Sequence, residues 1–150
     1  PVAGTLYDLY CGYGLFGISF AGSAKRVIGA DIAPAAIEAA GRIATHLKIT
    51  TARFTRSDLN ETSLVSLMQR AGPSDVAMLD PPRNGTAPGV IEVIAGRRCH
   101  RVVHLFCNIE VMPEEVQRWK KAGYTIVEAV PMDMFPGTAT VEIAGVFIPS

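Results

Sequence analysis

Paired cysteines are missing from this sequence. It contains three cysteines, and no two of them stand in a CxxC spacing. An odd count without paired spacing argues against a disulfide framework and a zinc site, and it favours a reducing, cytoplasmic location. The three histidines also lack metal-ligand spacing, so we predict no metal site. His104 falls in an apolar run and is predicted to be a core or edge histidine.

Long apolar runs and a surplus of charge are missing as well. No apolar run approaches the roughly 20 residues of a membrane-spanning helix, so we expect no membrane partner. The 14 basic and 14 acidic side chains cancel to a formal net charge of zero. A domain that binds nucleic acid by itself would usually carry a basic face. If the partner is RNA, most phosphate contacts must therefore come from another part of the protein.

The composition that is present indicates one folded domain. The chain has 150 residues, of which 49% are apolar and 19% are charged, which is enough to bury a sizeable core and is unlike a disordered protein. The chain begins without Met and enters its first expected strand almost at once. We therefore expect residues 1–150 to be a single domain cut from a longer protein.

Strand-like and helix-like segments alternate along most of the chain. Apolar runs predict strands at 5–10, 26–32, 52–57, 76–79 and 101–106. Helical spacing, with Pro or Gly at the ends, predicts helices at 15–21, 34–47, 62–71, 88–95 and 113–122. The extended runs 124–134 and 140–148 are joined by a segment too short for a parallel crossover. The pattern predicts an α/β fold, a doubly wound, mostly parallel, Rossmann-like sheet with an antiparallel last strand.

A glycine-rich loop follows the first expected strand. Gly12-x-Gly14-x-x-Gly17 stands between that strand and a helix, where glycine lets the backbone turn tightly and approach a ligand. Asp31 ends the second strand, roughly twenty residues after the glycine loop, which is the spacing at which an acid accepts hydrogen bonds from ribose hydroxyls. The pattern predicts adenosine binding but does not separate NAD from S-adenosylmethionine. A tight turn with Asp31 as a helix cap is the structural alternative.

Two polar side chains stand directly after buried strands. Cys107 follows the run 101–106, and Asp80 follows the run 76–79 and opens Asp80-Pro-Pro-Arg83. In an open parallel sheet, the ends of neighbouring strands face one crevice in which ligands bind. The two prolines enforce an extended, rigid exit that can hold a flat ring. A thiol in that crevice is a candidate nucleophile, whereas a thiol in mid-strand would be a small apolar side chain.

Four motifs, in this order, resemble those of one enzyme family. They are Asp8-Leu-Tyr-Cys-Gly-x-Gly14, Asp80-Pro-Pro-Arg-x-Gly85, Phe106-Cys-Asn108 and Asp133-Met-Phe-Pro-x-Thr-x-x-x-Glu142. Together they are similar to the catalytic domain of the RNA uridine-5-methyltransferases, which use S-adenosylmethionine to make 5-methyluridine in ribosomal or transfer RNA. The resemblance covers essentially the whole chain. It implies a class I methyltransferase fold and an N-terminal RNA-binding module outside residues 1–150.

The resemblance also implies roles for single residues. Cys107 matches the family's nucleophile, and Glu142 matches its general base. The family's cofactor-contacting positions fall on Tyr10, Gly12, Gly14, Asp31, Asp58 and Asp80. A cofactor-binding glutamine that the family supplies from an upstream segment has no counterpart in these 150 residues.

The chemistry explains why a thiol and a carboxylate are needed together. Carbon 5 of uracil is too weak a nucleophile to take a methyl group at neutral pH, but a thiolate added to carbon 6 makes carbon 5 electron-rich. A base must then remove the carbon 5 proton so that the thiolate can leave. The uridine must be flipped out or taken from a loop. Because a free cysteine titrates near about 8.5, we expect the site to lower the pKa of Cys107.

Three residues depart from the family pattern. Phe106 and Ile109 stand where the family usually has Ser before the cysteine and Pro after the asparagine, and Thr140 stands where it usually has His. The first two flank the nucleophile, and the third removes a group that would orient Glu142. Three alternatives therefore stay open. They are a methyltransferase for another RNA base or a small molecule, an inactive RNA- or cofactor-binding module, and a nicotinamide-binding domain.

Overall fold

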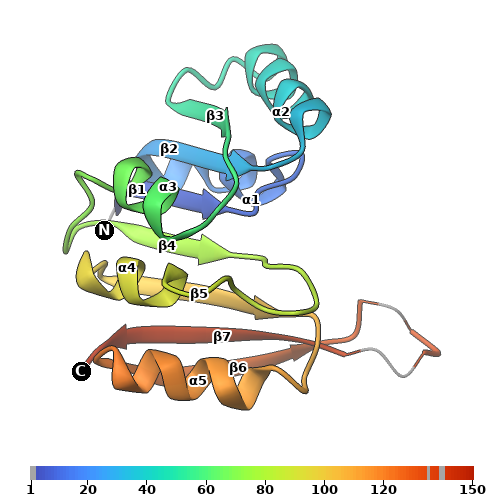
Figure 1. The fold of residues 1–150 in the computed structure, drawn as a ribbon. Helices are drawn as coiled ribbons and strands as arrows, with labels where there is room; N and C mark the ends of the chain where they lie inside the picture. Colours follow the sequence, from blue (N-terminus) through green and yellow to red (C-terminus); the bar gives the residue numbers. More distant parts are fainter. Residues whose placement is uncertain (1–2, 135, 139–140) are drawn as a thin grey trace.

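A computed structural model describes residues 3–134, 136–138 and 141–150. Strands and helices alternate along the chain, as Figure 1 shows. In chain order the elements are β1 (Ala3–Leu9), α1 (Leu15–Ser19), η1 (Ala21–Ser23), β2 (Ala24–Asp31), α2 (Pro34–His46), β3 (Ala52–Arg56), α3 (Glu61–Leu67), β4 (Val76–Leu79), α4 (Val90–Gly96), β5 (Arg101–Phe106), α5 (Met112–Lys121), β6 (Tyr124–Met132) and β7 (Glu142–Pro149).

The strands form one sheet in the order β3-β2-β1-β4-β5-β7-β6. The pairs among β1 to β5 are all parallel, whereas β7 pairs antiparallel with both β5 and β6. The predicted doubly wound sheet with an antiparallel last strand is therefore confirmed. The carboxyl ends of β1, β2, β4 and β5 point to the same side, on the right in Figure 1. We call this side the carboxyl edge.

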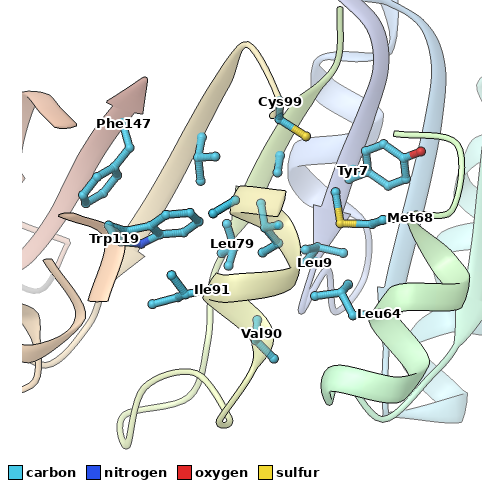
Figure 2. Close-up of a cluster of buried hydrophobic side chains, with 14 of the residues drawn as sticks. Tyr7, Leu9, Leu64, Met68, Leu79, Val90, Ile91, Cys99, Trp119 and Phe147 are labelled. Atoms are coloured by element: carbon cyan, nitrogen blue, oxygen red, sulfur yellow. The ribbon is translucent and has the colours of Figure 1, made fainter. Parts of the chain in front are cut away.

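Helices cover both faces of the sheet. The helices α3, α4 and α5 pack on one face, in front in Figure 1, and α1 lies behind the sheet. Figure 2 shows the main core between the sheet and the front helices, where Leu9 and Leu79 from the strands meet Ile91 and Trp119 from the helices. Each of these side chains is fully buried, and burial of one such side chain contributes roughly 1.5–3 kcal/mol. This core fixes the strand ends that carry the polar loops.

Local sequence sets the ends of the longer helices. Pro34 occupies the first turn of α2, where its missing N–H costs no hydrogen bond. The first turn of α5 carries Glu114 and Glu115, and its last turn carries Lys120 and Lys121, which matches the helix dipole.

Two boundaries differ from the sequence prediction because of left-handed backbone. Tyr10 has a φ of 62°, so it lies outside β1 rather than at its end. The helix expected from Pro88 starts at Val90, because the preceding Gly89 adopts a φ of 84°. A third boundary differs without left-handed backbone: the helix α3 ends at Leu67, before the predicted Ala71.

A hollow of about 800 Å³ lies away from the carboxyl edge. It is lined by residues from the amino-terminal halves of β1, β4 and β5, among them Leu6, Val76 and Arg101. None of the predicted site residues lines it. The candidate site therefore has to be built from the loops at the other end of the strands.

Among the described residues, no helix combines the length and apolarity needed to cross a membrane. No group of His, Cys, Asp and Glu side chains within those ranges could hold a metal ion.

Candidate active site at the carboxyl edge of the sheet

The carboxyl edge brings Cys107 and Glu142 together through strand register. In the antiparallel pair of β5 and β7, Phe106 lies opposite Ile143. Cys107 directly follows the first residue of this pair, and Glu142 directly precedes the second. Asp80 directly follows the neighbouring parallel strand β4. The predicted nucleophile, general base and cofactor-contacting carboxylate thus stand at the ends of adjacent strands.

The thiol of Cys107 lies against the proline loop. Its Sγ atom is 3.8 Å from the carbonyl oxygen of Pro81, and the side chain is partly exposed. The neighbouring Asn108 donates a hydrogen bond from Nδ2 to the carbonyl oxygen of Arg83 at 3.1 Å. The two loops are therefore joined side by side, with the partly exposed thiol at their junction.

The electrostatics of Cys107 are opposite to the expectation. Burial raises the pKa of the thiol, and the carboxylates of Asp80 and Glu142 raise it further. The prediction that the site lowers this pKa is therefore wrong for the protein alone, because burial and two nearby negative charges all disfavour the thiolate. The pKa of Asp80 is raised as well, first by burial and then by Glu142.

Replacing Glu142 with glutamine is expected to lower the pKa of Cys107, because it removes one of the two negative charges that disfavour the thiolate. The pH dependence of iodoacetamide alkylation measures this pKa in the protein without cofactor. Cys11 and Cys99 are buried and should react slowly. Glu110→Gln, an exposed change in the next loop, is the matched control. An unchanged alkylation profile in Glu142→Gln would show that the two side chains are not coupled.

The glycine loop and Asp31 form one hydrogen-bonded unit. The N–H of Gly12 donates to Oδ2 of Asp31 at 2.9 Å, and the N–H of Ala33 donates to Oδ1 at 2.8 Å. Ala33 is the N-cap of α2, and no side chain caps the helix, so Asp31 is not the cap. Each carboxylate oxygen keeps a lone pair for a further donor. Gly12 has a φ of 50° and open space where a Cβ would stand. The loop and acid therefore fit an adenosine with two ribose hydroxyls.

The remaining predicted cofactor positions differ in their surroundings. Asp58 is exposed just after β3, and the adjacent Ser57 donates its N–H to the carbonyl oxygen of Asp31 at 2.9 Å. Gly14, with a φ of 78°, is the N-cap of α1. Tyr10 packs its ring partly against the main core. Its buried hydroxyl has no hydrogen-bond partner within the described residues. The segment that carries Asp58 is therefore joined to Asp31 through the Ser57 backbone, whereas the Tyr10 hydroxyl is buried.

Asp8 is a buried acid whose role the sequence did not reveal beyond its place in a motif. Its side chain is 1% exposed, and its Oδ2 accepts a hydrogen bond from the N–H of Gly17 at 2.7 Å. Burial raises the pKa of Asp8 to about 6, with smaller contributions from Asp80 and Asp31. The residue fixes the start of α1 beneath the glycine loop. The sequence signal for a buried acid at this position is an Asp inside an apolar run.

Replacing Asp8 with asparagine is expected to make stability less sensitive to pH. The folded pKa of about 6 lies above the ordinary 3.8, so the wild-type fold loses stability as pH rises from about 4 to 6. The full gap corresponds to roughly 3 kcal/mol. The amide still accepts from Gly17 and carries no charge. Urea unfolding of both proteins between about pH 4 and pH 7 measures the difference, which should grow with pH in favour of Asp8→Asn. A difference that stays constant with pH would contradict the assignment.

Two of the three departures from the family pattern, Phe106 and Ile109, lie in the part of the chain that the structure describes. Phe106 is 2% exposed and stacks on His104 with ring centroids 4.2 Å apart, on the core face of β5. Ile109 is exposed. Thr140 lies outside the described residues. His104, predicted as a core or edge histidine, is a core histidine, because it is fully buried and its Nδ1 accepts from Nε1 of Trp119. Its Nε2 has no hydrogen-bond partner among the described residues.

Comparisons of the sequence with known proteins give one consistent family. A family model described as tRNA (Uracil-5-)-methyltransferase matches residues 2–150. An uncharacterized RNA methyltransferase of Streptococcus mutans is 31% identical over 144 residues, which cover 96% of this chain and 32% of the relative. One from Bacillus cereus is 33% identical over 138 residues, which cover 92% and 30%. The chain thus spans about a third of the length of these relatives.

Comparison with solved structures agrees. The crystal structure of Pyrococcus abyssi tRNA (uracil-54, C5)-methyltransferase in complex with S-adenosyl-L-homocysteine superposes with a TM-score of 0.81 and 29% identity, over 98% of this chain and 35% of that protein. An rRNA methylase from Streptococcus thermophilus superposes with a TM-score of 0.71 and 17% identity, over 98% of this chain and 87% of that protein. The second likeness supports the fold alone.

Proposed function

The chain belongs to the tRNA (uracil-5-)-methyltransferase family, and we propose that it is the catalytic part of an enzyme that transfers a methyl group from S-adenosylmethionine to carbon 5 of a uridine in RNA. The observation that supports the proposal is that Cys107 and Glu142 lie directly beyond the last paired residues of β5 and β7, where the Glu142 carboxylate is close enough to raise the pKa of the Cys107 thiol. The similar Pyrococcus abyssi structure, a tRNA uracil C5 methyltransferase with bound S-adenosyl-L-homocysteine, supports the substrate class and the cofactor.

Cys107 acts as the nucleophile in this proposal. Its thiolate adds to carbon 6 of the uracil ring, which leaves carbon 5 electron-rich. The thiol is partly exposed and stands beside Pro81, so one side of the ring has access to sulfur. Burial raises the pKa of the thiol, and Asp80 and Glu142 raise it further, so the thiolate is disfavoured in the protein alone, and the positive charge of bound S-adenosylmethionine would favour it.

Glu142 completes the reaction as the base. After carbon 5 has been methylated it carries both a methyl group and a proton. The Glu142 carboxylate takes that proton, the ring regains its double bond, and the Cys107 sulfur leaves with the electron pair of its bond to carbon 6. Ionised Glu142 opposes an early thiolate, since it raises the thiol pKa. The same charge makes it ready to accept a proton once sulfur is bound to carbon.

The glycine loop and the acids at the ends of β2 and β3 suit the cofactor. Asp31 has free lone pairs for ribose hydroxyls, and Gly12 leaves space for a close backbone approach. S-adenosylmethionine, when bound, supplies the methyl group on a positively charged sulfur. Asp80 stands at the end of β4, between this loop and Cys107 in the strand order, and its carboxylate would face both ligands.

RNA contacts outside the uridine itself are proposed to come from parts of the protein beyond these 150 residues. The chain has no net charge, and three of its 14 basic residues, Arg97, Arg98 and Arg101, lie just before or at the start of β5, the end of the strand opposite Cys107. Non-specific RNA binding depends on phosphate contacts by Lys and Arg. The cytoplasmic location stays a prediction, to which the three unpaired cysteines are suited.

Release of tritium from RNA that carries [5-³H]uridine tests the proposed reaction. The assay uses the complete gene product, because the chain spans about a third of the length of its relatives. We expect one tritium to reach water for each methyl group transferred. Methyl transfer with full retention of tritium would assign the activity to another atom or base. Cofactor binding in calorimetry without any methyl transfer would identify a binding module, and NADH binding in place of S-adenosylmethionine would identify a nicotinamide site.

A further inference from the structure

We propose that Glu115 is a positioning residue for this site, because it ties the loop after Asp80 to the strand that carries Cys107. The expected effect of Glu115 on methyl transfer rests on the proposed function, whereas the structural link between the loop and the strand does not. Glu115 lies on α5 and is 4% exposed. It forms a buried polar group with Thr86, His104 and Trp119, which we call the Glu115 cluster. No residue of this cluster belongs to the predicted site.

The loop side of the cluster is held by two donors. The N–H of Thr86 donates to Oε1 of Glu115 at 2.7 Å, and the Thr86 hydroxyl donates to the same oxygen. Gly85, with a φ of 81°, packs so closely that a Cβ would stand 3.0 Å from Cδ of Glu115. At the other end of the loop, the N–H of Asp80 donates to the carbonyl oxygen of Leu9 at 3.2 Å. The segment 80–86 is therefore anchored at both ends.

On the strand side of the cluster, the direction of the hydrogen bond between Trp119 and His104 is fixed. The indole N–H of Trp119 can only donate, and it donates to Nδ1 of His104 at 3.0 Å. Nδ1 of His104 is therefore the acceptor, and its Nε2 lies 3.3 Å from Oε2 of Glu115. Neither of these two atoms has a hydrogen-bond partner among the described residues, so the contact is a close polar approach. Glu115 thus accepts hydrogen bonds from the loop and approaches β5 through His104.

Charge and burial show that Glu115 is held as a carboxylate. Burial alone would raise its pKa, but the close contact with His104 and the hydrogen bonds from Thr86 outweigh burial, and the pKa is lowered. The backbone N–H and the hydroxyl of Thr86 supply two hydrogen bonds to one buried anion, and Nε2 of His104 lies 3.3 Å from its other oxygen. Arg118 adds a cation 3.7 Å from Oε1. A buried carboxylate with this many donors is costly to replace with a group that also donates.

The cluster links the two parts between which the uracil ring would lie. His104 is on β5 and stacks on Phe106, the residue just before Cys107. Thr86 follows directly on the Asp80-Pro-Pro-Arg-x-Gly85 segment. A misplacement of about 1 Å between reacting groups costs roughly 100-fold in rate. Loosening the cluster should therefore slow the chemical step and leave the glycine loop and Asp31 unaffected.

Glu115→Gln is the sharpest test, because the amide fails in either orientation. If its oxygen faces Thr86, its NH₂ faces the Nε2–H of His104, and if it is turned around, its NH₂ faces the N–H of Thr86. Glu114→Gln is the matched control, since Glu114 is the preceding residue on α5 and is exposed. Glu115→Asp, which keeps the acceptor chemistry, should restore part of the lost function.

Two readouts separate this tie from the reaction. In hydrogen–deuterium exchange on the complete gene product, we expect the peptide that contains Thr86 to exchange at least about tenfold faster in Glu115→Gln than in Glu114→Gln. In methyl transfer, we expect kcat to fall roughly 10- to 100-fold with the dissociation constant for S-adenosylmethionine unchanged. Unchanged exchange, or an unchanged kcat in a folded Glu115→Gln protein, would overturn the proposal.

If Glu115→Gln does not fold, Thr86→Val removes only the hydroxyl donor and must shift both readouts in the same direction. If no variant, wild type included, methylates RNA, the proposed function fails, and the exchange result alone decides the tie.

Discussion

Methyl transfer to RNA is expected to disappear when Cys107 is replaced with alanine, with kcat lower by a factor on the order of 10⁴ or more. The reason is chemical. Without a nucleophile at carbon 6, carbon 5 of uracil stays too electron-poor to take a methyl group, and no other described thiol can substitute. Cys11 and Cys99 are both buried. Radiolabelled methyl transfer from S-adenosylmethionine to RNA measures the effect on the complete gene product.

Cys99→Ala is the matched control for this experiment. Cys99 is fully buried and lies just before β5, at the end opposite Cys107. Its loss should lower stability modestly and leave kcat within a few-fold of wild type. Calorimetry with S-adenosylmethionine should give the same dissociation constant for Cys107→Ala and wild type. Methyl transfer that survives Cys107→Ala would assign Cys107 to a bystander role and favour a methyltransferase for another base or a small molecule.

A covalent protein–RNA intermediate is expected to accumulate when Glu142 is replaced with glutamine. Glutamine cannot take the carbon 5 proton, so the Cys107 sulfur cannot leave after the methyl group has been transferred. Steady-state kcat should fall by about 10²- to 10⁴-fold, the usual contribution of a general base. The first methyl transfer still takes place, because it precedes the missing step. A slowly migrating band that contains both RNA and transferred methyl label on a denaturing gel measures the intermediate.

Glu128→Gln provides the comparison for Glu142→Gln. Glu128 lies on β6 of the same hairpin and is exposed, so the change removes one carboxylate without touching Cys107. This variant should turn over normally and show no slow band. Normal turnover in Glu142→Gln itself would move the general base to another residue. A slow band without transferred methyl label would place the block before methyl transfer.

Much of the fold follows from local sequence signals. Apolar runs, a glycine loop and Pro or Gly at helix ends predict each strand and helix to within a few residues, and the short connection after β6 predicts an antiparallel pair. Two errors in the predicted boundaries have one cause, which is positive φ. The strand β1 ends before Tyr10, and the helix α4 begins only after Gly89. A tyrosine with left-handed backbone has no sequence signal, because such conformations are rare for residues with a side chain.

The candidate site is less predictable because it depends on contacts between distant segments. The sequence places Cys107 and Glu142 at strand ends, but only the insertion of β7 between β5 and β6 makes them neighbours. The expected lowering of the thiol pKa is wrong because burial of Cys107 raises this pKa, and Asp80 and Glu142 raise it further. Glu115 follows Glu114 at the start of an amphipathic helix, and nothing in the sequence shows that only the second of these is buried.

Trapping with RNA that contains 5-fluorouridine tests the central claim most directly. Fluorine occupies the position of the proton that Glu142 would remove, so the sulfur of Cys107 should remain bound to carbon 6 after methyl transfer. We predict a complex that resists denaturation, forms only with S-adenosylmethionine present, and yields a Cys107 peptide that carries a methylated fluorouridine. A protein that methylates ordinary RNA but forms no such complex, or whose complex maps to another residue, would contradict the account.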